Sequence, residues 1–201
     1  MKLSVPTEIL EIHHKLIRAD FEAYLVGGCV RDLLLDKEPK DWDITTNAKP
    51  EEIQLLYDET FYENEYGTVG VVTQSEDPRL KVIEVTPYRL EGTYSNVRHP
   101  DHVEWSNNLA DDLKRRDFTI NAIAYDPEKN ELIDLHKGQD DLKRRIIATV
   151  GNPKERFAED ALRMLRALRL AAELDFTIDG ETMKGIVESS FNLEKISLFS
   201  A

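Results

Sequence analysis

Hydrophobic and polar positions follow several different patterns along the first part of the chain. After Pro6, isoleucine and leucine recur at helical spacing, which predicts an amphipathic helix. Residues 23–26 form a short apolar run that predicts a buried strand, and residues 30–35 predict a short helix that ends before Pro39. Pro50 is followed by two glutamates and therefore predicts the start of another helix.

The middle of the chain combines strand patterns with an irregular stretch. Residues 69–73 and 80–85 predict two strands joined by a hairpin turn, and residues 131–135 predict a further strand. Residues 118–125 predict a short helix. Residues 91–108 have no period and are predicted to form a long polar loop, which in a compact domain is usually functional or mobile.

From Pro153 onward the pattern becomes helical. Residues 155–174 predict one long helix, and residues 180–189 predict another. The predicted apolar face of the long helix consists of Leu162, Leu165, Leu168 and Ala172. The sequence therefore predicts an α/β part that ends near residue 150, followed by a helical segment.

Composition narrows the class of protein. The 201 residues are 41% hydrophobic and 32% charged, which is ordinary for a soluble globular protein. No apolar run approaches the roughly 18 residues of a membrane helix, and the first residues lack the apolar core of a signal peptide. The single cysteine, Cys29, fits a reducing compartment. We therefore expect a cytoplasmic protein with no membrane partner.

Charge is distributed unevenly. The net charge of −13 argues against a general nucleic-acid binder, because phosphate backbones require cationic partners. Basic residues nevertheless cluster at positions 114–116 and 143–145, and again at Arg163, Arg166 and Arg169. Net charge governs solubility and steering rather than a local site, so these clusters remain candidates for binding phosphates.

The most informative chemistry is a glycine turn followed by two carboxylates. Gly27 and Gly28 follow an apolar strand, and such a turn at a helix start binds phosphate through backbone N–H groups. If residues 42–45 form a strand, Asp41 and Asp43 point to one face and repel each other unless a cation lies between them. Oxygen ligands of this kind suit Mg²⁺. The alternative is an ordinary turn and ordinary loop carboxylates.

Three further groups have both a structural and a functional interpretation. Glu84 lies in an apolar strand, where it either faces solvent or contributes a third carboxylate from a neighbouring strand. Arg116 is either a solvated charge or a site residue, and Asp117 beside it is an N-cap in the plainer interpretation. Asp160 and Arg163 share a predicted helix face, where they form a weak ion pair or together hydrogen-bond the edge of a base.

Five segments, in this order, resemble the head domain of the class II tRNA nucleotidyltransferases, the CCA-adding enzymes, and of the related bacterial poly(A) polymerases. They are Gly27-Gly28-x-x-Arg31-Asp32, Asp41-x-Asp43, Gly67-Thr68-Val69, Arg115-Arg116-Asp117-Phe118-Thr119-x-Asn121-Ala122 and Glu159-Asp160-x-x-Arg163-x-x-Arg166. The resemblance covers residues 20–190. It implies an α+β fold, with a polymerase-beta-like nucleotidyltransferase head over residues 1–150 that has a mixed or antiparallel sheet and flanking helices. An all-helical partial neck over residues 151–201 would follow.

The resemblance also implies roles for individual residues. Gly28 and Arg31 would contact the phosphates of the incoming nucleotide, and Asp41 and Asp43 would carry the catalytic Mg²⁺. From its place in the apolar strand, and not from the resemblance, Glu84 is predicted to be a further catalytic carboxylate. The other nucleotide-binding positions would be Arg116 on the ribose and phosphate side, Asp160 and Arg163 at the base, and Arg166 and Arg169. Residues 91–104 resemble the loop that helps to switch specificity from C to A, although Asn96 stands where an aspartate is expected.

The function implied is transfer of CMP and AMP from CTP and ATP to the 3′ end of tRNA by two-metal in-line chemistry. Two alternatives remain open. One is a poly(A) polymerase or an A-adding relative. The other is a nucleotide-binding fragment without useful RNA extension, because members of the family are much longer and hold tRNA with further domains. A shortened neck would also expose apolar helix faces, so we expect a possible homodimer.

Overall fold

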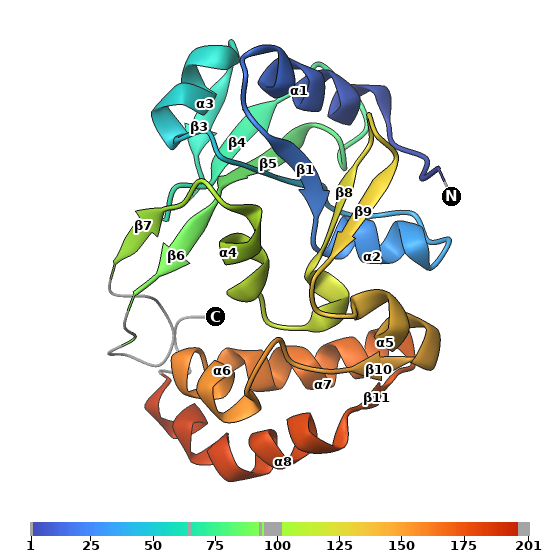
Figure 1. Ribbon diagram of the computed structural model, residues 1–201, viewed down its shortest axis with the longest axis vertical. Coiled ribbons are helices and arrows are strands. Elements are labelled where there is room, and N and C mark those ends of the chain that lie inside the picture. The colour runs from blue at the N-terminus through green and yellow to red at the C-terminus, as the bar shows by residue number, and fades with distance from the viewer. Residues whose placement is uncertain (1, 64–65, 93, 95–101, 197–201) are drawn as a thin grey trace.

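A single mixed sheet organises the N-terminal three quarters of the molecule (Figure 1). The structure, a computed structural model, describes residues 2–63, 66–92, 94 and 102–196. Within these ranges seven strands follow the order β3 (Thr60–Tyr62), β4 (Val69–Val72), β5 (Val82–Pro87), β2 (Asp43–Thr46), β1 (Ala23–Val26), β8 (Ile123–Asp126) and β9 (Glu131–Asp134). Strands β2 and β5 run parallel, and the other neighbours run antiparallel. The predicted α+β fold with a mixed sheet is confirmed.

The two faces of this sheet have different environments. One face packs into the main core against α1 (Thr7–Arg18), α2 (Gly28–Leu34) and α3 (Pro50–Leu56). On the other face α4 (Leu109–Lys114) packs over Val26 and Ala124. Alternation along β5 buries Ile83 and Val85 in the main core and leaves Glu84 on the second, more open face.

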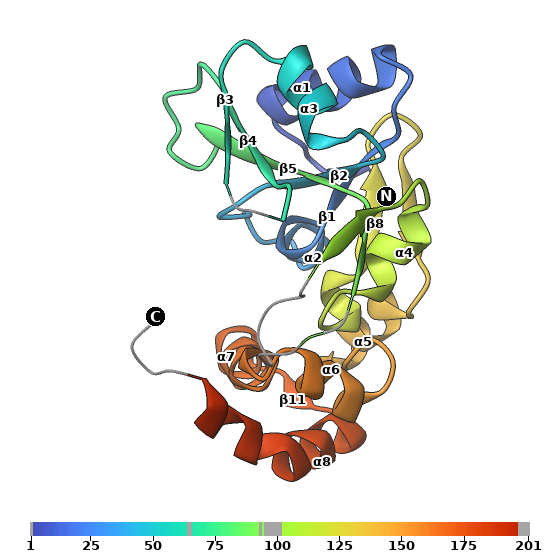
Figure 2. The ribbon, with the colours of Figure 1, turned by 90° about the vertical axis from the view of Figure 1, so that its left-hand side faces the viewer.

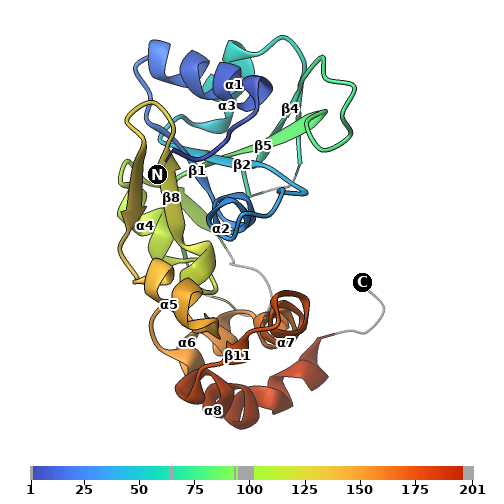
Figure 3. The same ribbon diagram turned by 90° about the vertical axis from the view of Figure 1, so that its right-hand side faces the viewer.

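Helices of the C-terminal segment lie below the sheet, and α7 is the one on the side of α2 (Figures 2 and 3). These helices are α6 (Pro153–Glu159), α7 (Leu162–Leu174), α8 (Gly180–Ser189) and the 3-10 helix η2 (Ser190–Lys195), and α5 (Gly138–Arg144) precedes them in the chain. Two short strands, β10 (Ile146–Ile147) and β11 (Thr177–Ile178), pair in parallel and so connect the chain before residue 150 with the segment after it. The C-terminal segment is therefore helical except for β11. No helix within the described residues has the length and apolar character needed to cross a membrane.

Residues 118–125 do not form the predicted helix. A single 3-10 turn, η1 (Thr119–Asn121), leads directly into β8. Strand β8 pairs with β1 on one side and β9 on the other, and all four of its residues are buried. A strand buried on both faces has no polar alternation, so periodicity alone does not distinguish its short apolar run from a helix.

The long helix predicted over residues 155–174 is broken, and its predicted apolar face is wrong. α6 ends at Glu159, and the carboxylate of Asp160 accepts a hydrogen bond from the Leu162 N–H at 2.9 Å, which starts α7 anew. Leu165 and Leu168 are 48% and 46% exposed. The residues that α7 buries are Arg163, Met164, Ala167 and Leu170.

The predicted loop over residues 91–108 contains regular structure at its ends. β6 (Arg89–Glu91) pairs antiparallel with β7 (Val103–Trp105), so the segment is partly a hairpin. Residues 93 and 95–101 lie outside the described residues, and with them Asn96 and most of the segment that resembles the specificity loop.

Candidate functional site

Three predicted carboxylates meet at the open face of the sheet, on adjoining strands. β2 begins at Asp43, and Asp41 lies in the bend that precedes the strand. Asp43 is paired directly with Glu84 across the parallel β2 and β5 strands, so both side chains project to the same face. Asp41 and Asp43 line the same cleft. The topology thus brings together side chains that are about forty positions apart in the sequence.

The surroundings of Asp43 and Glu84 disfavour the ionised forms of their carboxyl groups. Burial raises the pKa of Asp43, and the charge of Asp41 raises it further, while Arg116 opposes both effects. Partial burial and the charges of Asp43, Glu63 and Asp41 raise the pKa of Glu84 to about 7. Negative charge is therefore crowded here, and a cation would relieve the repulsion.

The donor set fits a magnesium ion held by two protein ligands. Within the described parts of the chain, no group of three or more His, Cys, Asp or Glu side chains is arranged to hold a metal ion. Glu84 lies beside Asp43 on the neighbouring strand and adds negative charge close to the Asp41 and Asp43 pair. Mg²⁺ commonly binds through one or two carboxylates and completes its octahedron with phosphate oxygens and water, so two hard oxygen donors are sufficient.

The glycine turn passes directly against the carboxylates. Gly27 has φ +83°, and a Cβ at this position would lie 3.0 Å from Oδ2 of Asp43 and 3.4 Å from Nη1 of Arg116. Glycine is thus required both by the backbone conformation and by the close approach of two charged groups. The turn, the carboxylate and the guanidinium meet at one point.

A cleft of about 340 Å³ joins the turn to the C-terminal helices. Its lining includes five of the predicted site residues, namely Gly28, Arg31, Asp41, Asp43 and Arg169. Arg31 is held in place by an ion pair with Asp32 at 2.7 Å and a hydrogen bond to Oδ1 of Asn121 at 3.0 Å. The cleft therefore lies between α2, β2 and α7, with cationic groups on both sides of the carboxylates.

Arg116 is oriented by a residue that the sequence analysis missed. Asp112 is fully buried, and its Oδ2 accepts hydrogen bonds from Nη2 of Arg116 at 2.9 Å and Nε at 3.3 Å. Its Oδ1 accepts two more from Arg115, at 2.9 and 2.5 Å. The i, i+3 and i, i+4 spacing from Asp112 to the two arginines is a signal in the sequence that could have identified it.

Phe118 rather than Asp117 is the N-cap of η1, and Asp117 instead links two segments of the chain. Its Oδ1 accepts a hydrogen bond from the Phe118 N–H at 2.8 Å, and its Oδ2 forms an ion pair with Arg166 of α7 at 2.8 Å. This pair joins the segment after α4 to α7 and so places one predicted nucleotide-binding arginine beside the segment that carries Arg116.

The prediction that Asp160 and Arg163 lie side by side on one helix is wrong. Asp160 precedes α7, whereas Arg163 lies within it and is buried. Nη1 of Arg163 donates to Glu159 at 2.6 Å, and Nη2 donates to the main-chain carbonyl of Arg115 at 3.3 Å. Glu159, which the sequence analysis passed over, also binds Arg156. Neither Asp160 nor Arg163 is among the described residues that line the cleft with Asp41 and Asp43.

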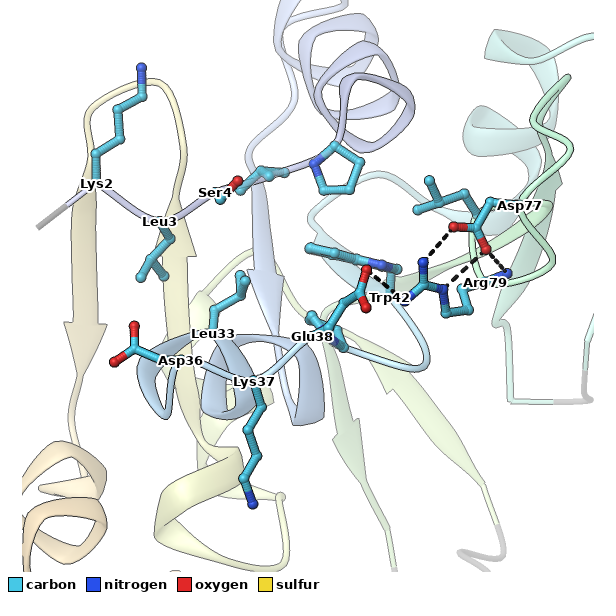
Figure 4. Close-up of a pocket in the computed structure, with 14 residues that line it drawn as sticks. Lys2, Leu3, Ser4, Leu33, Asp36, Lys37, Glu38, Trp42, Asp77 and Arg79 are labelled. Carbon is cyan, nitrogen blue, oxygen red and sulfur yellow. Dashed lines mark hydrogen bonds and ion pairs between the residues drawn. The ribbon is translucent and has the colours of Figure 1, made fainter.

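Two hollows of about 570 Å³ each lie elsewhere, and the described residues that line them include none of the predicted site residues. One of them is lined by the N-terminal residues, Trp42 and Arg79 (Figure 4). There Arg79 forms ion pairs with Glu38 and Asp77, both at 2.7 Å. Trp42 lies between Asp41 and Asp43 in the sequence, and its side chain is buried. The buried Trp42 side chain therefore supports the bend that carries Asp41.

Comparison with known proteins identifies the family. The model of the poly(A) polymerase head domain matches residues 23–148, which is more than half of the chain. This chain belongs to the poly(A) polymerase head-domain family. The resemblance predicted from the five sequence segments is therefore confirmed at the level of the family.

Curated proteins and solved structures that are similar to this chain include CCA-adding enzymes. The CCA-adding enzyme of Limosilactobacillus reuteri is 48% identical over 185 residues, which are 92% of this chain and 44% of that protein. The Bacillus stearothermophilus CCA-adding enzyme in complex with CTP superposes with a TM-score of 0.85 at 41% identity, over 94% of this chain and 45% of that one. The Thermotoga maritima CCA-adding enzyme in complex with tRNA gives 0.74 at 25% identity, over 96% and 45%. The chain thus spans about half the length of these proteins.

Proposed function

We propose that this chain carries the catalytic site of a CCA-adding enzyme, which transfers CMP and AMP from CTP and ATP to the 3′ end of tRNA. The observation that carries the proposal is the single cleft shared by Asp41, Asp43, Gly28, Arg31 and Arg169. The similar CCA-adding enzymes, one in complex with CTP and one with tRNA, support this choice within the family. Because they are about twice as long, the activity of the whole protein is part of the proposal.

In this proposal Asp41 and Asp43 hold magnesium. Bound there, Mg²⁺ would lower the pKa of the attacking 3′-hydroxyl and neutralise charge on the leaving pyrophosphate. Glu84 lies directly beside Asp43 and accepts a hydrogen bond from the hydroxyl, which orients it. The two carboxylates would leave the remaining coordination positions of such an ion to water and phosphate oxygens.

The phosphates are bound within the cleft, and the base is bound by residues outside its lining. Arg31 donates to the triphosphate, Gly28 allows it to approach the backbone, and Arg116 and Arg169 add positive charge. Around the start of α7, Asp160 and Arg163 select the base, and Arg166 completes the nucleotide site. The contacts of Arg163 with Glu159 and with the Arg115 carbonyl fix its guanidinium before a nucleotide arrives.

In this proposal the two parts of the chain have different roles. Residues 1–150 form the nucleotidyltransferase head, and residues 151–201 form the nucleotide-selecting part of the neck. Exposed leucines on α7 support self-association, and light scattering that finds a monomer at micromolar concentration would exclude it.

Primer extension tests the proposal. The substrate is tRNA that lacks its 3′ end, with Mg²⁺ and CTP, ATP or both, and Asp41→Ala serves as the inactive control. Ordered addition of C, C and A is the expected result. A run of A alone would instead establish a poly(A) polymerase, a product suggested by the name of the family. Nucleotide binding without extension would contradict the proposed activity for this chain.

A further inference from the structure

A row of four paired residues crosses the open face of the sheet from its edge to the catalytic carboxylates. Phe61 on β3 pairs with Gly70 on β4, Gly70 pairs with Glu84 on β5, and Glu84 pairs with Asp43 on β2. Directly paired residues on neighbouring strands project to the same face. The ring of Phe61 therefore shares a face with Glu84 and Asp43.

Gly70 lets this ring lie down over the sheet. A Cβ at Gly70 would come within 2.5 to 2.9 Å of three ring atoms of Phe61, so the ring occupies the space where a side chain would be. The next residue in the row is Glu84, so the ring leans toward the carboxylates. Phe61 is still 42% exposed. It presents an open aromatic surface that contributes little to the core.

The ring lines a second cleft, which meets the nucleotide cleft at Asp41. This second cleft has a volume of about 460 Å³, and its walls include Phe61, Val82, Glu84, Asp41 and Lys40. Asp41 and Lys40 also line the nucleotide cleft. The two clefts thus share the candidate metal ligand Asp41 and the cation of Lys40. In the second cleft, Phe61 and Val82 provide apolar surface beside Glu84.

The strand order assigns the two cavities to opposite sides of Asp43. The glycine turn and Arg31 follow β1, whereas Glu84 lies on β5 and Phe61 on β3, and β2 runs between the two groups. In nucleotidyl transfer the attacking and leaving oxygens are roughly in line across the phosphorus. If the triphosphate lies with Arg31, the leaving pyrophosphate is on that side, and the attacking hydroxyl enters from the side of Glu84.

We propose that Phe61 stacks on the base of the 3′-terminal nucleotide of the acceptor RNA and so positions its hydroxyl beside Asp41 and Glu84. The inference rests on the proposed function and adds to it the site of the second substrate. An aromatic ring stacks on any base, which suits an acceptor whose last base changes after each addition. A base is uncharged, so the carboxylates of this cleft do not repel it.

Steady-state extension with Phe61→Ala tests the inference, with acceptor RNA and CTP varied separately. Loss of one stacked base is expected to raise the KM for RNA by roughly tenfold, while the KM for CTP and kcat at saturating RNA stay within about twofold. Phe61→Tyr keeps the ring and is expected to restore the wild-type KM. The matched control is Tyr62→Ala, since Tyr62 is 50% exposed on the same strand and is paired with Val69 of the main core.

An acceptor whose terminal nucleotide is abasic provides an independent readout. The wild-type protein is expected to lose the same roughly tenfold on this RNA, and Phe61→Ala to lose nothing more. An unchanged KM for RNA in an active Phe61→Ala variant, or an equal effect of Tyr62→Ala, would overturn the inference and leave the proposed function standing. Failure of the wild-type protein to extend any RNA would remove the proposed function, and the inference with it.

Discussion

Asp112 is a buried carboxylate shared between two arginines, and replacing it with asparagine has a cost that follows from its contacts. One oxygen accepts two hydrogen bonds from Arg115, at 2.9 and 2.5 Å, and the other accepts two from Arg116, at 2.9 and 3.3 Å. Asparagine keeps one acceptor oxygen and turns an N–H₂ donor toward the other guanidinium. One arginine therefore loses both bonds, and the negative charge that balanced the two cations is gone.

The expected loss of folding free energy is about 3 kcal/mol. Two charge-assisted hydrogen bonds are removed, and a guanidinium is left largely buried beside a donor, which together cost about 3–5 kcal/mol when a buried pair is broken. The lower end applies because Asp112→Asn preserves the volume and half of the contacts. For a chain of this size, the loss corresponds to a fall in Tm of roughly 6–12 °C.

The pH dependence of this loss has a definite sign. Burial by itself would raise the pKa of Asp112, but Arg116 and Arg115 hold it below its usual value. Its stabilising effect is therefore complete above the unfolded-state pKa of about 4 and is lost as the pH falls through the lower folded-state pKa. The difference in stability between the wild type and Asp112→Asn should be constant from pH 8 to about pH 5 and shrink below about pH 4.

Urea denaturation monitored by circular dichroism measures both quantities. The matched control is Asp140→Asn, because Asp140 is exposed and its ion pair with Lys143 spans 3.7 Å, and its effect should be within about 0.5 kcal/mol. A loss below about 1 kcal/mol for Asp112→Asn at pH 7, or a difference that grows in acid, would refute the reasoning.

Two further predictions concern the glycine turn and the orientation of α7. Gly27→Ala should destabilise the fold by about 1–3 kcal/mol and weaken CTP binding in calorimetry, because φ is +83° and the new Cβ would approach Asp43 and Arg116. Wild-type affinity and stability would contradict this. Met164→Ala should cost about 2–5 kcal/mol in urea denaturation and Leu165→Ala less than about 1 kcal/mol, the reverse of what the sequence pattern predicted. Equal losses would contradict the observed burial.

Local patterns predicted the helix that begins after Pro6 because one of its faces is buried. The strand over residues 23–26 was predicted because the run is short and apolar and leads into a glycine turn. Strand β8 was missed because it is paired on both sides and buried throughout, which leaves no polar alternation to distinguish it from a helix. Periodicity reports burial, and burial on both faces hides the period.

The orientation of α7 depends on partners that periodicity does not reveal. Arg163 is buried because Glu159 and main-chain carbonyls accept its hydrogen bonds, whereas Leu165 and Leu168 face outward. In the candidate site, too, some features follow from the sequence pattern and others depend on long-range partners. The residue types of Asp41 and Asp43 indicated the chemistry, but the pairing of Asp43 with Glu84 follows from the strand order, and Asp112 is identified through its contacts. Long-range partners determine those positions.

The single-turnover rate of CMP addition by Asp41→Asn and Asp43→Asn tests the central claim most directly. If these carboxylates hold the catalytic metal, each variant should lose at least about a thousandfold in rate, since metal stabilisation of the transition state is worth several kcal/mol. The circular dichroism spectrum should be unchanged, and Asp140→Asn should react at the wild-type rate. Activity within about tenfold of wild type in either site variant would contradict the account.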